Sequence, residues 1–394
     1  CKSRYRLDVL AEELSLKNKK KILRALDPAT YEGRIDDQRV IDGFEKLLEN
    51  EERLAAVVRE HVACPACGAK GEFTAARQFN LMFKTHVGPT EDSSAVVYLR
   101  PETAQGIFVN FANVLNASRQ KLPFGIAQIG KAFRNEINTK NFLFRTREFE
   151  QMEMQYFVRP GEEDTWFEYW REKRMQWFLD LGMKPEQLRW HKHEKLAHYA
   201  KAAYDIVFDF PFGWGEVEGI HSRTDFDLSS HEQYSGKSLK YYDEETKQHL
   251  VPYVVETSIG AGRSLMAFLV AAYAEETAPT AGGKEETRTV LKFHPGLAPM
   301  KAAILPLVNR DGMDDIARKL TEDLQGQFRV FYDDSGAIGR RYRRQDEIGT
   351  PFCFTVDSQT LRDNTVTVRE RDSMNQERIG INTARQYLFD KLTL

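Results

Sequence analysis

Cysteine is scarce in this sequence, with 4 among 394 residues. So few cysteines exclude a disulfide-stapled scaffold and favour a reducing compartment. No apolar run reaches about 18 residues, the length that a membrane-spanning helix needs. No basic segment followed by an apolar one opens the chain, so no secretion signal is expected. These absences predict a cytoplasmic protein without a membrane partner.

Neither sign of charge is in excess, because 56 Lys and Arg residues stand against 59 Asp and Glu residues. The balance excludes a polybasic nucleic-acid-binding tail, but it leaves room for a local basic patch. A hydrophobic content of 41% and a mean hydropathy of −0.54 are typical of a soluble globular protein. At about 100–200 residues per domain, the length suggests two or three domains.

Two common glycine-rich nucleotide signatures are also missing, the P-loop and the Gly-x-Gly-x-x-Gly fingerprint. The initiator Met is absent as well, since the chain begins at Cys1. We therefore expect a further segment of the natural protein to precede this residue.

The pattern of the chain divides it into three parts. Residues 1–94 contain short amphipathic helices and predict a helical arm. Residues 95–292 contain strand-like runs with few strand–helix crossovers, which predicts an antiparallel sheet with helices at its side. Within this part, residues 278–284 are breakers that indicate a linker or flexible loop. Residues 293–394 alternate strand and helix, so the whole chain is predicted to be an α+β protein with a C-terminal α/β domain.

Cys64 and Cys67 belong to a Cys-x-x-Cys-Gly string, which is typical of half a zinc knuckle because the turn directs two thiolates to one metal. Tetrahedral Zn²⁺ needs four ligands. Cys1 is a candidate third ligand, and we expect the fourth to lie upstream. A redox dithiol and two unrelated thiols are the alternatives. Cys353 lies in an apolar strand and is interpreted as a buried residue.

The first pattern suited to a nucleotide is an Arg-Asn-Glu string at residues 134–136, followed by a polar loop and a strand from residue 148. In a strand, Phe149, Gln151 and Glu153 share one face. An aromatic ring and a carboxylate beside arginines suit a purine ring, a cationic group and phosphates. A hairpin laced by surface ion pairs is the alternative.

The second pattern is a strand over residues 251–258, a glycine-containing turn and a helical run over residues 264–276. Glu256 and Ser258 share a strand face, and Arg263 lies at the start of the helix. A helix N-terminus is a natural anion site.

Residues 134–136, 144–149 and 260–263 resemble motifs 2 and 3 of class II aminoacyl-tRNA synthetases. Longer strings at residues 99–106, 149–153, 218–227, 294–299 and 343–351 resemble the dimeric-type glycyl-tRNA synthetases. The resemblance covers nearly the whole chain. It implies a class II catalytic sheet of six or seven antiparallel strands flanked by helices, with an anticodon-binding domain at residues 293–394. It also implies a homodimer that joins glycine to its tRNA with ATP and Mg²⁺, and a motif 1 segment upstream of residue 1.

The resemblance assigns roles to single residues. Arg134 matches the family's residue that binds the α-phosphate of ATP. Arg263 matches the residue that covers the adenine ring and reaches the γ-phosphate, and Glu216 matches the acid that holds Mg²⁺. These three are the implied catalytic residues. The implied ATP-binding set is Arg134, Asn135, Glu136, Phe144, Arg145, Phe149, Glu216, Val217 and Arg263. The implied glycine-binding set, with three acids around the ammonium group, is Arg6, Glu102, Gln151, Glu153, Glu256 and Ser258. One position departs from many relatives, because Gly262 stands where they have an acid.

A basic cluster with an aromatic residue inside it lies at residues 339–344. In an anticodon-binding domain it predicts tRNA contacts by Arg340, Arg341, Arg343 and Arg344; elsewhere such a cluster is usually a solvated face. Two other functions compete: a non-catalytic nucleic-acid-binding relative, and a ligase for another small amino acid. The joint presence of the phosphate-binding arginines and the three acids disfavours the first, and the acid ring itself disfavours the second.

Overall fold

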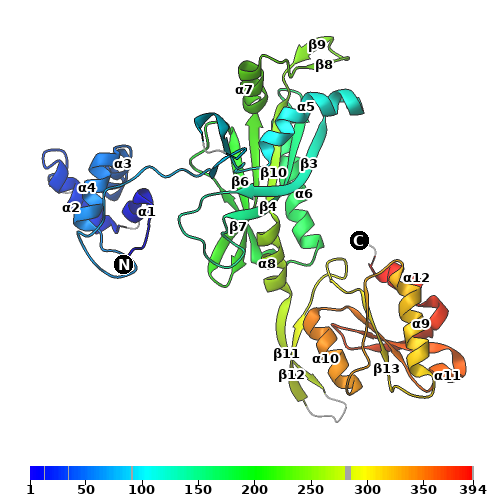
Figure 1. The fold of residues 1–394 in the computed structure, drawn as a ribbon. Helices are drawn as coiled ribbons and strands as arrows, with labels where there is room; N and C mark the ends of the chain where they lie inside the picture. Colours follow the sequence, from blue (N-terminus) through cyan, green and yellow to red (C-terminus); the bar gives the residue numbers. More distant parts are fainter. Residues whose placement is uncertain (13, 34, 90–91, 280–284, 393–394) are drawn as a thin grey trace. The chain divides into compact units, whose positions relative to one another are not determined.

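The computed structural model describes residues 1–12, 14–33, 35–89, 92–279 and 285–392. These residues form two compact units (Figure 1). The smaller unit contains residues 1–102 and 132–148, and the larger contains residues 103–131 and 149–394. No helix among the described residues combines the length and the apolar character needed to cross a membrane.

The smaller unit begins with short helices packed around an apolar core, as the sequence predicts. Three of them begin at Ser15, Asp36 and Asn50, whose side-chain oxygens each accept a backbone N–H from the first turn. A two-stranded antiparallel sheet follows later in this unit. The elements are α1 (Leu7–Glu12), α2 (Leu16–Leu26), α3 (Asp37–Leu48), α4 (Glu51–His61), β1 (Lys84–His86) and β2 (Val96–Tyr98).

A six-stranded sheet is the centre of the larger unit, with the strand order β3-β4-β10-β7-β6-β5 (Figure 1). The pairings from β4 to β5 are all antiparallel. The strands are β3 (Phe124–Phe133), β4 (Glu148–Val158), β5 (Leu188–Lys192), β6 (Ala202–Phe210), β7 (Gly213–Thr224) and β10 (Tyr253–Gly260). The strand-like pattern anticipated β4, from residue 148, and β10, over residues 251–258. It missed β7, because this strand is rich in glycine and carries charged residues at buried positions.

Helices pack beside this sheet and complete its core. Helices α5 and α7 contribute to an apolar cluster in which the Phe111 and Phe157 ring centroids are 4.6 Å apart. Helix α6 packs against β7 and β10, and α8 follows β10 directly. The remaining elements here are α5 (Ala104–Ser118), α6 (Glu163–Asp180), α7 (Phe226–Ser235), α8 (Ala261–Ala272), β8 (Tyr241–Asp243) and β9 (Gln248–Leu250).

The predicted helix over residues 264–276 is too long, because α8 ends at Ala272 and the chain continues as a strand. β11 (Tyr273–Pro279) pairs antiparallel with β12 (Glu285–Leu291), so hairpin pairing overrides the helical preference of the Ala-Glu sequence. The predicted breaker cluster begins within β11, which contains its residues 278 and 279. Its residues 280–284 lie outside the described residues.

The C-terminal part has a five-stranded mixed sheet with the order β14-β13-β15-β16-β17. β13 is parallel to both β14 and β15, and the other pairings are antiparallel. The elements are β13 (Ala302–Pro306), α9 (Met313–Gln325), β14 (Val330–Tyr332), α10 (Ile338–Ile348), β15 (Phe352–Val356), α11 (Thr360–Asp363), β16 (Thr365–Glu370), β17 (Gln376–Gly380) and α12 (Ala384–Leu392). The predicted fold class, an antiparallel sheet with flanking helices followed by an α/β domain, is confirmed.

Candidate functional site

The neighbouring strands β4 and β10 bring together polar residues that the sequence assigns to glycine. The register pairs Ser258 with Glu153, and Glu256 with Gln155. Because side chains alternate along a strand, these residues and Gln151 lie on one face of the sheet. The Gln151 amide donates to the Ser258 hydroxyl at 3.0 Å. Glu153 and Glu256 are both 3% exposed, so two carboxylates are buried on this face.

Glu153 is held by donors from two sides. The Thr103 backbone N–H donates to Glu153 Oε2 at 3.1 Å, and the Thr103 hydroxyl donates to the same oxygen. Gln155 Nε2 donates to Glu153 Oε1 at 3.3 Å. The orientation of the carboxylate is therefore fixed. Thr103 and Gln155 were not among the residues predicted for the site, although polar residues at 151, 153 and 155 form a period-two run that could have revealed Gln155.

Glu256 is held by two basic residues of β7. Arg223 Nη1 donates to Glu256 Oε2, and its Nε and Nη2 donate to the Asp227 carboxylate at 2.8 and 3.0 Å. His221 Nδ1 lies 3.7 Å from Glu256 Oε1. Burial opposes ionisation of Glu256, but His221 and Arg223 outweigh it and hold the pKa of Glu256 well below its usual range. The site therefore holds a carboxylate anion before any ligand binds.

Arg263 and Glu216 form a second cluster in the larger unit. Arg263 lies in the first turn of α8, and its Nη1 is 3.1 Å from Glu216 Oε2 on β7. The same nitrogen donates to the Glu216 carbonyl oxygen at 3.1 Å. The Glu216 side chain is 49% exposed, whereas the neighbouring Val217 is buried. An accessible cation and anion side by side suit a phosphate and a divalent cation.

Of the other predicted nucleotide residues, Phe149 lies on β4 in the larger unit, and the rest belong to the smaller unit, in the loop that follows β3. Arg134 Nε donates to the Pro101 carbonyl at 3.1 Å, and the Arg134 backbone N–H donates to the Arg147 carbonyl at 2.9 Å. Lys140 and Arg145 exchange two backbone hydrogen bonds of 3.2 Å, which close the loop. The loop carries Arg134, Asn135, Glu136, Phe144 and Arg145.

Two residues assigned to glycine also lie in the smaller unit. Glu102 is partly buried and directly precedes Thr103. The Arg6 side chain is 65% exposed and forms an ion pair with Asp8. The structure thus brings Gln151, Glu153, Glu256 and Ser258 together within the larger unit, and it places Glu102 and Arg6 in the other.

Comparisons with known proteins identify what this chain is similar to. The family model "tRNA synthetase class II core domain (G, H, P, S and T)" matches residues 83–273, and "Anticodon binding domain" matches residues 301–391. The glycine–tRNA ligase of Streptomyces coelicolor is 56% identical over 334 residues, 84% of this chain and 73% of that protein. The glycine–tRNA ligase of Alkaliphilus oremlandii is 50% identical over 394 residues, 100% of this chain and 79% of that protein.

The chain belongs to the glycine–tRNA ligase family. The resemblance stated from the motifs is therefore confirmed at the level of the family, with a class II core and an anticodon-binding domain. A solved structure, Giardia lamblia prolyl-tRNA synthetase in complex with prolyl-adenylate, has a TM-score of 0.59 at 18% identity. It covers 79% of this chain and 63% of that one, and the likeness supports the fold alone.

In this glycine–tRNA ligase, the basic cluster on α10 is mostly engaged in the fold. Arg341 is 3% exposed and donates to the carbonyl oxygens of Gly336 and Pro306, so the prediction that it contacts tRNA is wrong for this structure. Its donors stabilise the loop that precedes α10. Arg343 and Arg344 are partly buried and paired with acids, Arg343 with Glu286 and Asp346, and Arg344 with Asp333. Arg340 is exposed.

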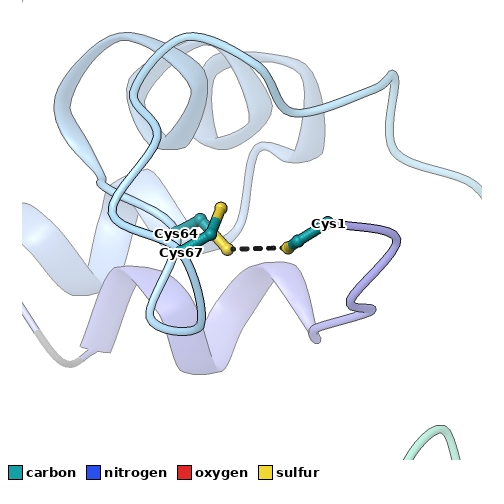
Figure 2. Close-up of side chains that lie close together, drawn as sticks. All are labelled: Cys1, Cys64 and Cys67. Carbon is teal, nitrogen blue, oxygen red and sulfur yellow. Dashed lines mark hydrogen bonds between the residues drawn. The ribbon is translucent and has the colours of Figure 1, made fainter.

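The three cysteines predicted to bind metal converge in the smaller unit of the ligase (Figure 2). Their Sγ atoms all lie within 4.8 Å of one another, and those of Cys1 and Cys64 are 3.6 Å apart. Residues 63–70 form a tight turn in which the Cys64 N–H donates to the Ala69 carbonyl and the Gly68 N–H donates to the Cys64 carbonyl, each at 2.8 Å. Backbone hydrogen bonds from Cys67 and Ala66 lower the pKa of the Cys64 thiol. The turn therefore favours a thiolate, the form that binds metal.

Cys353 is a different kind of thiol. It lies in β15 and is 1% exposed. Burial raises its pKa to about 12, so it stays protonated at neutral pH. Its predicted buried position is confirmed.

Proposed function

We propose that this glycine–tRNA ligase forms glycyl-adenylate on the polar face of β4 and β10 and then transfers glycine to the 3′ end of its tRNA. The observation that carries the proposal is the pair of buried, oriented carboxylates, Glu153 and Glu256, beside the Ser258 hydroxyl. Buried anions favour a cationic ligand. Glycine has no side chain to bind, so its ammonium group is the natural point of attachment.

The reaction forms a bond between a glycine carboxylate oxygen and the α-phosphorus of ATP, and it breaks the bond from that phosphorus to pyrophosphate. The attacking carboxylate is already an anion, so no general base is required. Catalysis then depends on holding the reactants in line and on neutralising phosphate charge. Arg134 is assigned to the α-phosphate, and Phe149 is assigned to stack on the adenine ring.

Arg263 and Glu216 are assigned to the far end of the triphosphate. The two groups form an ion pair; in the proposed ATP complex Arg263 would bind the γ-phosphate, and Glu216 would be released from the pair to hold Mg²⁺. Opening the pair costs little, because Arg263 and Glu216 are 23% and 49% exposed and a pair near the surface contributes only about 0–1 kcal/mol. Glu216 would hold the ion, which supplies charge neutralisation to the phosphates. Asn135, Glu136, Phe144, Arg145 and Val217 complete the proposed ATP site.

The remaining assignments follow from family membership. We assign Glu102 as the third acid of the glycine site and Arg6 as a substrate-side arginine. Residues 1–94 are assigned as a helical arm, residues 95–292 as the catalytic core and residues 293–394 as the anticodon-binding domain. A cytoplasmic homodimer is proposed as the working form. Within the basic cluster, Arg340 is the proposed phosphate contact for tRNA, with Arg343 and Arg344 at its edge.

Zinc is proposed as a structural ion at Cys1, Cys64 and Cys67, with no part in adenylate formation. Zn–S bonds of about 2.3 Å in a tetrahedron place sulfur atoms about 3.8 Å apart, and the Cys1–Cys64 distance is 3.6 Å. The same distance is far too long for the S–S bond of a disulfide, about 2.05 Å. Elemental analysis of the purified chain should give one zinc per chain, lost in Cys64→Ser. A chain without zinc, cobalt or iron would contradict the assignment.

The glycine site is tested by Glu256→Gln and Glu153→Gln in glycine-dependent ATP–pyrophosphate exchange. Hydrogen bonds to charged groups contribute about 1.5–3 kcal/mol, so each variant should raise the KM for glycine roughly 10- to 150-fold with little change in the KM for ATP. The matched control is Glu150→Gln, one residue along β4 from Gln151 and exposed. If both variants kept the unaltered KM for glycine, the site would have to lie elsewhere.

A further inference from the structure

A row of alternating acids and histidines crosses the sheet beside the proposed glycine site. The register pairs Glu256 of β10 with His221 of β7. It pairs His221 with Ala203 of β6, which places Asp205, two residues along β6, on the same face. His193 Nε2 lies 2.7 Å from Asp205 Oδ2. The row therefore runs from Glu256 through His221 and Asp205 to His193.

The His221 ring is confined within this row. A Cβ atom on Gly219 would lie 2.8 Å from His221 Cε1, so glycine at that position makes the space that the ring occupies. Gly219 pairs with Ser258 of β10, and Ser258 pairs on its other side with Glu153 of β4. His221 Nδ1 is buried and accepts or donates no hydrogen bond to any described residue. Its nearest acidic oxygen is Glu256 Oε1, at 3.7 Å.

The charges around the ring favour its protonated form. Burial opposes protonation, but Glu256 and Asp205 outweigh it and raise the pKa of His221, while Arg223 acts in the opposite direction. Burial and the charge of Glu216 raise the pKa of Asp205. The other titratable groups along this face are Glu153 on β4 and His193 beyond β5.

We propose that His221 is a positioning residue for glycine: its imidazolium holds Oε1 of Glu256 while Arg223 holds Oε2, which fixes the carboxylate for the glycine ammonium group. This inference rests on the proposed function, since it takes Glu256 as the ammonium ligand. Arg223 alone contacts one oxygen of Glu256 and shares its other donors with Asp227. Among the described residues, the ion pairs of Glu256 are with Arg223 and His221. Arg223 is also bound to Asp227. Removing His221 therefore leaves Oε1 of Glu256 without the cation beside it.

The inference predicts a pH dependence with a defined sign. The protonated ring carries a positive charge and an N–H on both nitrogens. It loses the charge and one N–H when the pH rises through its raised pKa. The KM for glycine should therefore increase across that range, with a much smaller change in the KM for ATP, because Arg263 lies outside the row and Glu216 acts on the row through its charge at Asp205.

The test compares His221→Ala and His221→Gln in glycine-dependent ATP–pyrophosphate exchange from pH 6 to pH 9, with His249→Asn as the matched control. His249 is exposed on β9, outside the six-stranded sheet. We expect His221→Ala to raise the KM for glycine about tenfold at low pH, because Oε1 of Glu256 loses a positive charge 3.7 Å away, and to flatten its pH profile. His221→Gln should recover part of the KM but not the pH profile, because its donor is neutral.

Thermal melting separates positioning from folding. The role of His221 would be overturned if its replacement raised the KM for glycine and the KM for ATP equally. It would also be overturned if a variant that melts like the unaltered chain kept the same pH profile of the KM for glycine. Failure of the proposed function looks different: the unaltered chain would show no glycine-dependent exchange, or Glu256→Gln would leave the KM for glycine unchanged.

Discussion

Asp346 offers the sharpest prediction about stability, because one fully buried carboxylate on α10 joins three arginines. Its Oδ1 accepts Arg369 Nη1 at 2.8 Å, and its Oδ2 accepts Arg288 Nη1 at 3.0 Å and Arg343 Nη1 at 3.3 Å. Asp346 and Arg288 have no exposed side-chain surface, and Arg369 is 5% exposed. Asp346→Asn keeps the shape of the side chain but leaves buried guanidinium charge without its anion.

Breaking a buried pair by removing one partner costs about 3–5 kcal/mol. For a domain of this size, each kcal/mol lowers the melting temperature by roughly 4–8 °C. Calorimetry of Asp346→Asn should therefore show the transition of the C-terminal domain roughly 12–40 °C lower. Arg288 belongs to β12 and Asp346 to α10, so the change also loosens the attachment of the hairpin to this domain.

The matched control for this prediction is Asp334→Asn in the same domain. Its partner Arg318 is 56% exposed and Asp334 is 36% exposed, with a separation of 3.3 Å. An exposed pair of this kind contributes at most about 1 kcal/mol. If Asp346→Asn melted within 2 °C of Asp334→Asn, the buried network would not stabilise the domain as argued.

Three further predictions use single side chains. Arg340→Ala should weaken tRNA binding and reduce the slope of log affinity against log salt concentration by about one. Arg341→Ala should instead lower the melting temperature. Equal salt slopes for the unaltered chain and Arg340→Ala would contradict the proposed phosphate contact. With metal removed, a thiol reagent at pH 8 should modify the exposed Cys1 and Cys67 in the native chain but spare Cys353, which is buried and has a pKa of about 12. Modification of Cys353 before denaturation would refute its burial. Arg378 holds the pKa of Asp357 below its usual value, so Asp357 stabilises the fold above that value and loses this effect as pH falls. Asp357→Asn should therefore be destabilised in urea at pH 7, with the difference shrinking as the pH falls below the usual pKa of an aspartate; a constant difference would argue against ionisation as the cause.

Much of the architecture could be predicted from the sequence, because local pattern and tertiary structure agree in strands such as β4. There, alternation placed Gln151 and Glu153 on one face, and the register with β10 bears this out. The pattern failed where burial on both faces removed alternation. β7 reads as a mixture of glycine and charge, yet it lies in the middle of the sheet and supplies Arg223 and His221 to Glu256.

The side chains that hold the site were harder to predict than those assigned to substrates. Thr103, at the N-cap of α5, and Gln155 of β4 orient Glu153, but only the folded register brings them together. Arg341 shows the opposite case. It lies in a basic cluster typical of a nucleic-acid surface, and only the tertiary structure shows that its donors bind carbonyl oxygens. Charge in a sequence does not reveal whether it faces solvent.

Glycine-dependent ATP–pyrophosphate exchange is the most direct test of the central claim, run on the same preparation with alanine and serine in place of glycine. We predict exchange with glycine, and far weaker exchange with alanine or serine, which carry the β-substituent that glycine lacks. Arg134→Ala should abolish the glycine signal while the chain remains folded. Absence of exchange with glycine, or near-normal exchange in Arg134→Ala, would contradict the account.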